Sequence, residues 1–390
     1  MTEWKTLPLG EIASIERNGI KPTDIPSGTT YVGLENIKTG GSFVNVRTIE
    51  TGELASTKFL FSEKHVLYGK LRPYLAKIAR PTFSGICSTD ILPILPGPEL
   101  NRGYLAQFLR LPAMVDAAAS LTTGANLPRI SPKALEEFQI PLPSLGEQQR
   151  IAELLDRTEA LRARRRAALA QLDALTQSIF LDLFGDPATN PKDWSQTKLG
   201  ELLVKGPQNG LYKPSTDYGS GTQILRIDAF YDGVVTGLEE LKRVRISHDE
   251  RHLYALRSDD IVINRVNSLE YLGKSALIPK LMEPVVFESN MMRLAVNTDC
   301  VSPVYVIQFL QTNFVRTQIR KAAKNAVNQS SINQRDVAGF VINVPPLTLQ
   351  AKFARRVAAV EKLRAAHRAS LAELDALFAS LQYRAFRGEL

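Results

Sequence analysis

Residues 147–184 read EQQRIAELLDRTEALRARRRAALAQLDALTQSIFLDLF and contain neither proline nor glycine. Most of them are Ala, Leu, Arg, Gln and Glu, which have high intrinsic helix propensities. Ser144 and Glu147 have the spacing of a capping box, and Gly185-Asp186-Pro187 supplies a stop. The stretch therefore predicts one uninterrupted helix, about 57 Å long at ~1.5 Å per residue.

Apolar residues recur along this helix at spacings of three and four, which predicts a seam that packs against a partner helix. Arg165 interrupts the seam at one level. A buried polar residue at such a level would set the register of the helices, and an edge position with its head group in water is the alternative. The predicted seam residues are Ile151, Leu154, Leu161, Ala168, Leu172, Leu175 and Ile179.

The chain contains this helix twice. Leu172-Asp173-Ala174-Leu175 recurs 202 residues later as Leu374-Asp375-Ala376-Leu377, and His367 stands at the level of Arg165. If the two seams pack antiparallel, the second helix returns along the first, with an approximate two-fold axis through the pair. The second seam is predicted to consist of Phe353, Val360, Leu363, Leu374, Leu377 and Leu381.

The segments that precede the two helices, residues 1–145 and 194–347, also repeat. Trp4 and Trp194, the only tryptophans, each precede a Leu-Gly-Glu sequence, at an offset of 190. The growth of the offset from 190 to 202 predicts about twelve inserted residues in the middle of the second copy. Both segments are rich in Gly and Pro and contain short β-type runs and short helical stretches, which predicts two globular α+β domains.

These patterns together predict an α+β fold. Two globular domains would be joined by two long antiparallel coiled-coil helices, with an internal pseudo-two-fold repeat. The predicted order is domain 1 (1–145), the first long helix (146–185), a turn-rich linker (186–193), domain 2 (194–347) and the second long helix (348–390).

Composition narrows the class of protein. Lys and Arg number 48 against 40 Asp and Glu, and the net charge of +8 suits a polyanionic partner. No run of about 18 apolar residues exists, and the N-terminus lacks the layout of a signal peptide. We expect a cytoplasmic protein without membrane segments. Cys87 and Cys300 have no CxxC spacing and favour small buried hydrophobes over a metal site or a disulfide.

No catalytic or cofactor motif is found. The nearest sequence to an amino-methyltransferase motif, Asn343-Val344-Pro345-Pro346-Leu347, has an extra residue and no aromatic. No phosphate-binding GxxxxGK[ST] loop exists, and the four histidines lack the further ligands of a metal site. We therefore expect no catalytic residue, no cofactor and no metal.

Two segments resemble one known family, the specificity subunit of type I restriction–modification enzymes. They are the exit from domain 1, Ile140-Pro141-Leu142-Pro143-Ser144-Leu145-Gly146-Glu147-Gln148-Gln149-Arg150-Ile151, and the joint between the halves, residues 183–194. The second helix departs from this pattern, because it opens Thr348-Leu349-Gln350-Ala351 without the Glu-Gln-Gln run. We therefore expect an asymmetric docking surface.

The resemblance implies a subunit without catalysis of its own. Each globular domain, a target-recognition domain, would read one half of a split, asymmetric target in double-stranded DNA. The helices would fix the gap between the halves and dock two methyltransferase (modification) subunits and, through them, restriction (translocase/endonuclease) subunits.

Base reading in the major groove needs side chains that form paired hydrogen bonds, chiefly Arg or Lys with guanine and Asn or Gln with adenine. Three pairs of loops hold such residues at matching places in the two copies, and each residue could equally be an ordinary surface group. The candidates in domain 1 are Lys70, Arg72, Tyr74, Thr89, Asn126 and Arg129, and those in domain 2 are Arg265, Asn267, Asn290, Arg293, Asn328 and Gln329.

Two other classes of function compete with this one. A non-catalytic paired-helix scaffold would bind proteins at its globular ends and would not recognise DNA sequence. A nuclease or methylase with unrecognised motifs would be active as a purified chain. A DNA reader differs from the scaffold because its affinity for DNA falls steeply as salt rises.

Overall fold

The computed structural model describes residues 4–326 and 329–390. The chain forms two compact units. Unit 1 comprises the chain up to Ala167 together with residues 368–390, and unit 2 comprises residues 168–367. Each long helix contributes one part of its length to each unit, so the same type of helix pair is found in both.

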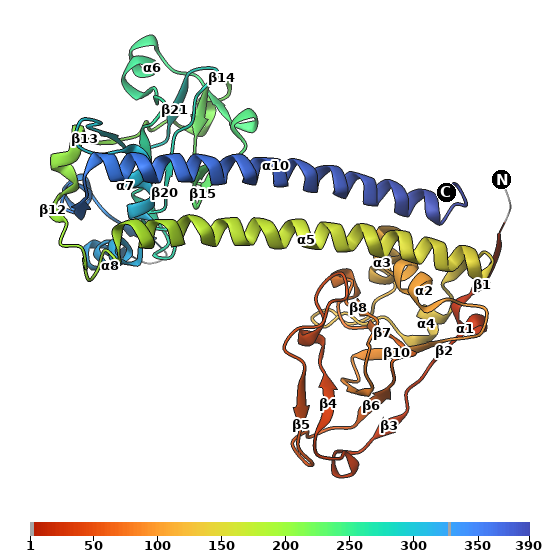
Figure 1. The fold of residues 1–390 in the computed structure, drawn as a ribbon. Coiled ribbons are helices and arrows are strands. Elements are labelled where there is room, and N and C mark those ends of the chain that lie inside the picture. The colour runs from red at the N-terminus through yellow and green to blue at the C-terminus, as the bar shows by residue number, and fades with distance from the viewer. Residues whose placement is uncertain (1–3, 327–328) are drawn as a thin grey trace. The chain divides into compact units, whose positions relative to one another are not determined.

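The two long helices are α5 (Leu145–Phe184) and α10 (Leu347–Ala385). They run antiparallel in each unit (Figure 1), because Arg162 pairs with Asp375 in unit 1 and Asp173 pairs with Arg364 in unit 2. This confirms the predicted α+β class with two long antiparallel helices.

At two levels of α5, the residue that faces the seam is the one after the predicted residue. Leu161 and Leu175 were assigned to the seam, but they are 48% and 42% exposed. Polar Arg162 and Thr176 occupy the inward positions beside them. The residues that face inward, buried or half-buried, alternate at spacings of four and three: Ile151, Leu155, Thr158, Arg162, Arg165, Leu169, Leu172, Thr176, Ile179 and Leu183.

The seam of α10 has the same register, displaced by 202 residues. Leu363 and Leu377, also assigned to the seam, are 53% and 48% exposed. The sequence interpretation was therefore wrong at the same two levels of both helices. The inward residues are Phe353, Val357, Val360, Arg364, His367, Leu371, Leu374, Phe378, Leu381 and Ala385.

The described residues of unit 1 form three sheets and four short α-helices. Strands β1 (Lys5–Pro8) and β11 (Gln139–Leu142) form a two-stranded sheet. A four-stranded sheet has the order β2 (Ala13–Ile15), β10 (Ile91–Pro96), β7 (Val66–Gly69), β8 (Ile78–Ala79). A five-stranded sheet has the order β3 (Gly19–Ile20), β6 (Lys58–Phe61), β9 (Gly85–Cys87), β4 (Thr29–Val32), β5 (Arg47–Ile49). The helices are α1 (Leu9–Ile12), α2 (Arg102–Leu109), α3 (Pro112–Ser120) and α4 (Pro132–Glu136).

Unit 2 repeats this plan with changes. Strands β12 (Ser195–Lys198) and β25 (Val341–Val344) pair as β1 and β11 do. A six-stranded sheet has the order β13 (Leu203–Asn209), β22 (Met291–Val296), β18 (Ile261–Asn264), β20 (Ser275–Leu277), β16 (Gly233–Val235), β15 (Phe230–Tyr231). Two three-stranded sheets have the orders β17 (Arg243–Val244), β14 (Tyr218–Leu225), β21 (Val285–Phe287) and β19 (Val266–Asn267), β24 (Gln329–Ser331), β23 (Lys324–Ala326). The short helices are α6 (His248–Tyr254), α7 (Pro303–Leu310), α8 (Asn313–Ala322) and α9 (Gln334–Ala338).

The additional residues of the second copy are spread over several loops. The parallel pair Val32–Cys87 recurs as Leu225–Phe287, so the offset is 193 at the first residue and 200 at the second. The inserted residues therefore lie in the middle of the second copy, as predicted, and enter at more than one place. A local change of structure accompanies this drift. Strand β9 has β6 as a neighbour, whereas its counterpart β21 is an edge strand with α6 packed beside it.

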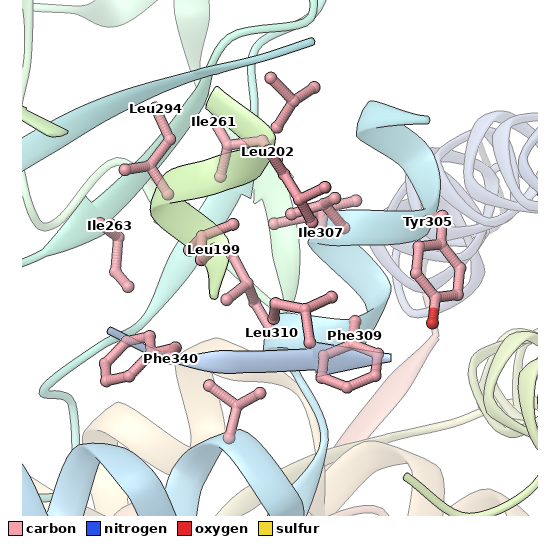
Figure 2. Close-up of a cluster of buried hydrophobic side chains, with 14 of the residues drawn as sticks. Leu199, Leu202, Ile261, Ile263, Leu294, Tyr305, Ile307, Phe309, Leu310 and Phe340 are labelled. Atoms are coloured by element: carbon pink, nitrogen blue, oxygen red, sulfur yellow. The ribbon is translucent and has the colours of Figure 1, made fainter. Parts of the chain in front are cut away.

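Each unit has its own hydrophobic core, into which the long helices insert. In unit 1, Ile151 and Leu155 of α5 and Ala385 of α10 belong to one cluster with the short helices and strands of domain 1. In unit 2, Phe180 and Phe353 join the cluster of which Figure 2 shows the centre, around Leu199, Ile263 and Leu310. The helices are thus part of both cores.

A buried glutamine ties the start of each long helix to its domain. In α5, Gln148 accepts the Asn101 N–H at 2.8 Å and donates to the Pro143 carbonyl at 2.8 Å. In α10, Gln350 accepts the Ser302 N–H at 2.7 Å and donates to the Pro345 carbonyl at 2.7 Å. The second helix therefore keeps the one glutamine of the Glu-Gln-Gln run that is buried.

Candidate nucleic-acid interface

In unit 1 the three predicted loops meet at the end of β7. The Lys70 N–H donates to the Asp90 carbonyl at 2.9 Å, and the Lys70 carbonyl accepts the Ile130 N–H at 3.1 Å. The Arg72 N–H donates to the Pro128 carbonyl at 2.8 Å. We name this assembly, residues 70–74, 88–90 and 126–130, loop cluster 1.

The side chains of loop cluster 1 differ in how far they are exposed and in whether they contact other side chains. The Arg129 guanidinium makes two hydrogen bonds to Asp90, at 2.8 Å and 3.1 Å, which raise the pKa of Arg129 and fix its orientation. Lys70 is half-buried. The exposed members are Arg72, Tyr74, Thr89 and Asn126.

Unit 2 builds the same backbone frame at the end of β18. The Arg265 N–H donates to the Asn290 carbonyl at 2.8 Å, and the Arg265 carbonyl accepts the Ile332 N–H at 3.0 Å. Asn267 lies opposite Ser330 in the β19–β24 pair. We name residues 265–267, 289–290 and 329–332 loop cluster 2. Its frame matches that of cluster 1, with Arg265 in the place of Lys70.

The predicted residues of domain 2 are distributed unevenly. Arg265 lies in cluster 2 and donates to the Ser289 carbonyl at 3.0 Å, Asn267 and Asn290 are half-buried, and Gln329 is exposed. Asn328 lies outside the described residues.

Arg293 is the member that the structure places apart from cluster 2. Its side chain is 13% exposed, donates to the Ala255 carbonyl at 2.7 Å and also hydrogen-bonds Gln208. It lines a cavity of about 540 Å³ between β13, α6 and β22, together with His248 and His252. The fold brings Arg293 to a different part of domain 2 because it lies inside β22, three residues beyond Asn290.

The two clusters present different polar groups on matched backbone positions. Arg72 corresponds to Asn267, and Asp90 corresponds to Asn290. Guanidinium, amide and carboxylate groups prefer different base edges in the major groove. One backbone frame therefore carries different hydrogen-bonding groups in the two units.

The two copies share a tyrosine that the sequence interpretation named in one copy only. Tyr74-Leu75-Ala76-Lys77 recurs as Tyr271-Leu272-Gly273-Lys274, at an offset of 197. Tyr74 was a candidate, but Tyr271 was not. The repeated Tyr-Leu-x-Lys sequence could have identified Tyr271. It is not found when the two copies are aligned at an offset of 190 or 202.

The part of the chain that is described holds neither a metal-binding cluster nor a helix that could span a membrane. Within residues 4–326 and 329–390, His, Cys, Asp and Glu nowhere gather in the threes that a metal ion would need. No helix in these ranges is both long and apolar enough to cross a bilayer.

Comparison with known proteins identifies relatives over most of the chain. The family model described as type I restriction modification DNA specificity domain matches residues 1–171 and 191–376. The chain is similar to the StySPI specificity subunit of Salmonella potsdam, with 27% identity over 326 residues, 79% of this chain and 69% of the relative. It is also similar to the EcoKI specificity subunit of Escherichia coli strain K12, with 28% identity over 327 residues and the same two coverages, 79% and 69%.

Solved structures share the fold. The S subunit of a type I restriction-modification system from M. genitalium matches with a TM-score of 0.64 and 14% identity, over 98% of this chain and 96% of that one. A chain from a structure of complex assembly and conformational transition of the type I R-M system matches with a TM-score of 0.60 and 21% identity, over 100% and 99%. Because the family model covers both copies and most of the chain, the protein belongs to the family of type I restriction–modification DNA specificity subunits.

Proposed function

We propose that loop clusters 1 and 2 each read one half of a split, asymmetric target in double-stranded DNA. The single observation that carries this proposal is the shared frame, in which Lys70 and Arg265 make the same two backbone hydrogen bonds while the side chains around them differ. Matched frames with unlike side chains are what two readers of unlike sequences require. The net charge of +8 favours association with the phosphate backbone.

The helices would dock two methyltransferase subunits on surfaces that match along much of their length and differ in the first turn, where Leu349 and Ala351 stand in place of Glu147 and Gln149. Single exposed leucines are common on any protein surface. Here exposed apolar side chains come in pairs 202 residues apart, so the two helices carry them at matching positions of the repeat. The pairs are Leu145 and Leu347, Leu161 and Leu363, Leu175 and Leu377, and Leu181 and Tyr383, all between 41% and 57% exposed.

Chemistry would then come from the partners. The docked methyltransferase subunits would supply methylation, and restriction (translocase/endonuclease) subunits would join through them. The chain itself would contribute sequence choice alone, and the gap between the half-targets would follow from the helices. The alternative of a scaffold without DNA recognition is not supported, because the matching family is that of DNA specificity domains.

The test is methylation mapping of DNA in cells that express this chain with its methyltransferase subunit. We expect R72A to change or relax one half-target only and N267A to change the other half only, with the gap unchanged. In vitro, the affinity of the assembled complex should fall with salt at a log–log slope of about −0.9 per phosphate neutralised. Simultaneous change of both halves by one variant, or salt-independent DNA binding, would contradict the assignment.

A further inference from the structure

Tyr74 lies in loop cluster 1, and Tyr271 lies four residues beyond Asn267 of loop cluster 2, so the two copies share a tyrosine next to clusters that otherwise differ. They occupy equivalent places, three residues before Lys77 and Lys274. The N–H of the last residue of the preceding strand donates to the lysine carbonyl in both units, from Gly69 to Lys77 and from Asn264 to Lys274. Both tyrosines are exposed, at 53% and 43% of their accessible surface.

The lysines shared by the two copies anchor the loop from inside. Lys77 Nζ donates to the Leu34 carbonyl at 2.6 Å, and Lys274 Nζ donates to the Ile227 carbonyl at 2.6 Å. The residue before each lysine has a left-handed backbone, with φ of 46° at Ala76 and 76° at Gly273. The lysine ammonium groups are thus hydrogen-bonded within the protein, whereas the tyrosines of the same motif are exposed to solvent.

The position of each tyrosine links it to the candidate readers. Tyr74 follows Arg72 by two residues, and Tyr271 follows Asn267 by four residues in the same loop. A side chain that is identical in both readers cannot account for two different half-targets. It suits a contact that all duplexes offer, and tyrosine hydroxyls are among the groups that bind backbone phosphates and set the orientation of a protein on DNA.

We propose that Tyr74 and Tyr271 each donate a hydroxyl hydrogen bond to a DNA backbone phosphate and so place the two readers on the duplex in the same way. This inference rests on the proposed function, because it assumes that both clusters face DNA. It assigns to the tyrosines a positioning role that is independent of sequence, in contrast to Arg72 and Asn267.

The experiment compares Y74F, Y271F and the double variant in the complex assembled with the methyltransferase subunit. Phenylalanine keeps the ring and removes the donor, and Y212F, at a tyrosine of domain 2 that is 78% exposed and lies outside loop cluster 2, is the matched control. A hydrogen bond to a charged group leads us to expect about a tenfold loss of affinity for each single variant. The double variant should lose about a hundredfold, because the free-energy losses at independent sites in separate units add. Both half-targets should stay unchanged.

Three results would overturn the inference. Wild-type affinity of Y74F and Y271F would exclude the hydroxyl contact, and a loss confined to Y74A and Y271A would assign the role to the ring. A changed half-target would make the tyrosines readers. The outcome is separable from the proposed function, because R72A and N267A must alter their half-targets whether or not the tyrosines contact phosphate.

Discussion

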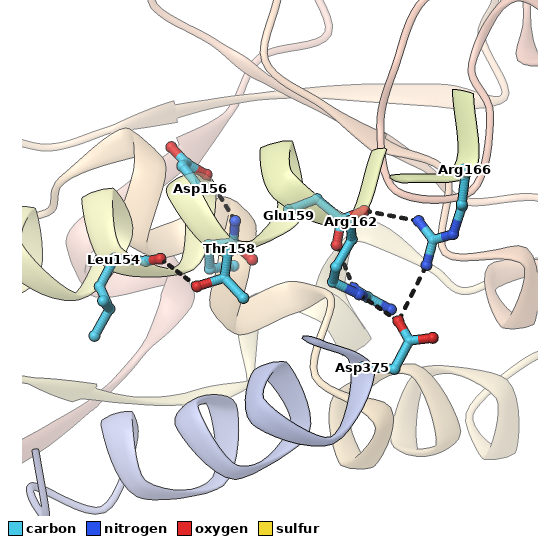
Figure 3. A network of polar contacts seen from close by, with 8 residues as sticks. Leu154, Asp156, Thr158, Glu159, Arg162, Arg166 and Asp375 are labelled. Carbon is cyan, nitrogen blue, oxygen red and sulfur yellow. Dashed lines mark hydrogen bonds and ion pairs between the residues drawn. The ribbon is translucent and has the colours of Figure 1, made fainter. Parts of the chain in front are cut away.

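Arg162 and Arg364, 202 residues apart, make the same pair of ionic contacts in the two units. Arg162 bonds Asp375 of the opposite helix at 2.6 Å and also the glutamate three residues before it (Figure 3). Arg364 bonds Asp173 at 2.9 Å and likewise the preceding glutamate at the same spacing. The two arginines are 16% and 9% exposed. The internal repeat therefore extends to buried side-chain chemistry, with the roles of the two helices exchanged.

Removing the aspartate of each ion pair should lower the free energy of unfolding more than replacing the arginine does. D173N should lower the free energy of unfolding by about 1–3 kcal/mol, because it leaves the more deeply buried guanidinium of Arg364 with one partner fewer. R364M should cost less, because an apolar side chain fills the seam without a charge. Urea unfolding of the purified chain measures both. D375N and R162M are the matched variants in unit 1, and equal losses for the aspartate and arginine variants would contradict this account.

Replacing the exposed leucines should weaken docking of the methyltransferase subunit without changing the stability of the chain. L161S and L363S should leave the unfolding free energy of the isolated chain within about 0.5 kcal/mol, as is usual for surface positions. They should weaken co-purification with the methyltransferase subunit. L155A, at a fully buried seam position, is the contrasting control and should destabilise the chain by about 2–5 kcal/mol. Unchanged assembly of L161S/L363S would remove these leucines from the docking surface.

Glu288 predicts a pH dependence of stability. Its carboxylate is 10% exposed, accepts the Ile227 N–H at 2.7 Å and lies 3.4 Å from Arg226. Burial nevertheless raises the pKa of Glu288 above its ordinary value of 4.5. Between the unfolded and folded pKa values the folded state binds more protons, so stability is greatest below the unfolded pKa and falls as pH rises through the folded one.

E288Q keeps the acceptor for Ile227 and removes the titration. We expect it to flatten the decline in unfolding free energy from about pH 4.5 upward and to match the wild type below that pH. Urea unfolding across the pH range tests this. D260N serves as a second variant, because burial also raises the pKa of Asp260. A steeper decline in E288Q than in the wild type would contradict the sign.

The two cysteines should differ in reactivity. Cys87 is buried, and burial raises its pKa to about 12, whereas Cys300 is exposed. Thiol reagents attack the thiolate. An absorbance titration with a thiol reagent near pH 8 should therefore detect one reactive thiol in the folded chain and two in denaturant. C300S should show none until unfolded, and rapid reaction of folded C300S would place Cys87 at the surface.

The long helices show how far the sequence pattern extends and where it stops. Absence of proline and glycine predicted α5 and α10, and the offset of 202 predicted their common register. The assignment of Leu161 and Leu175 to the seam was wrong, because it placed leucines inward wherever the spacing allowed. The structure places Arg162 and Thr176 inward instead, and Asp375 of the other helix compensates Arg162.

The candidate site, like the long helices, could be predicted from the sequence in part. The correspondence of Lys70 with Arg265 could be predicted, because both follow a short apolar strand that the repeat aligns. The separate placement of Arg293 could not, because its partners Gln208 and Ala255 are distant in sequence. The equivalence of Tyr271 with Tyr74 lay in the repeated Tyr-Leu-x-Lys sequence, and the backbone hydrogen bonds of Lys77 and Lys274 support it.

The sequence by itself determined the duplication, the fold class, the two long helices and the likeness to a specificity subunit, because these depend on local propensity and on periodicity along the chain. Tertiary structure decided which residues of each helix face inward and which loops meet. Those choices depend on partners contributed by distant segments, such as Asp375 for Arg162 and Asp90 for Arg129. No local pattern specifies such a partner, and the energy of the pair exists only when both have folded into contact.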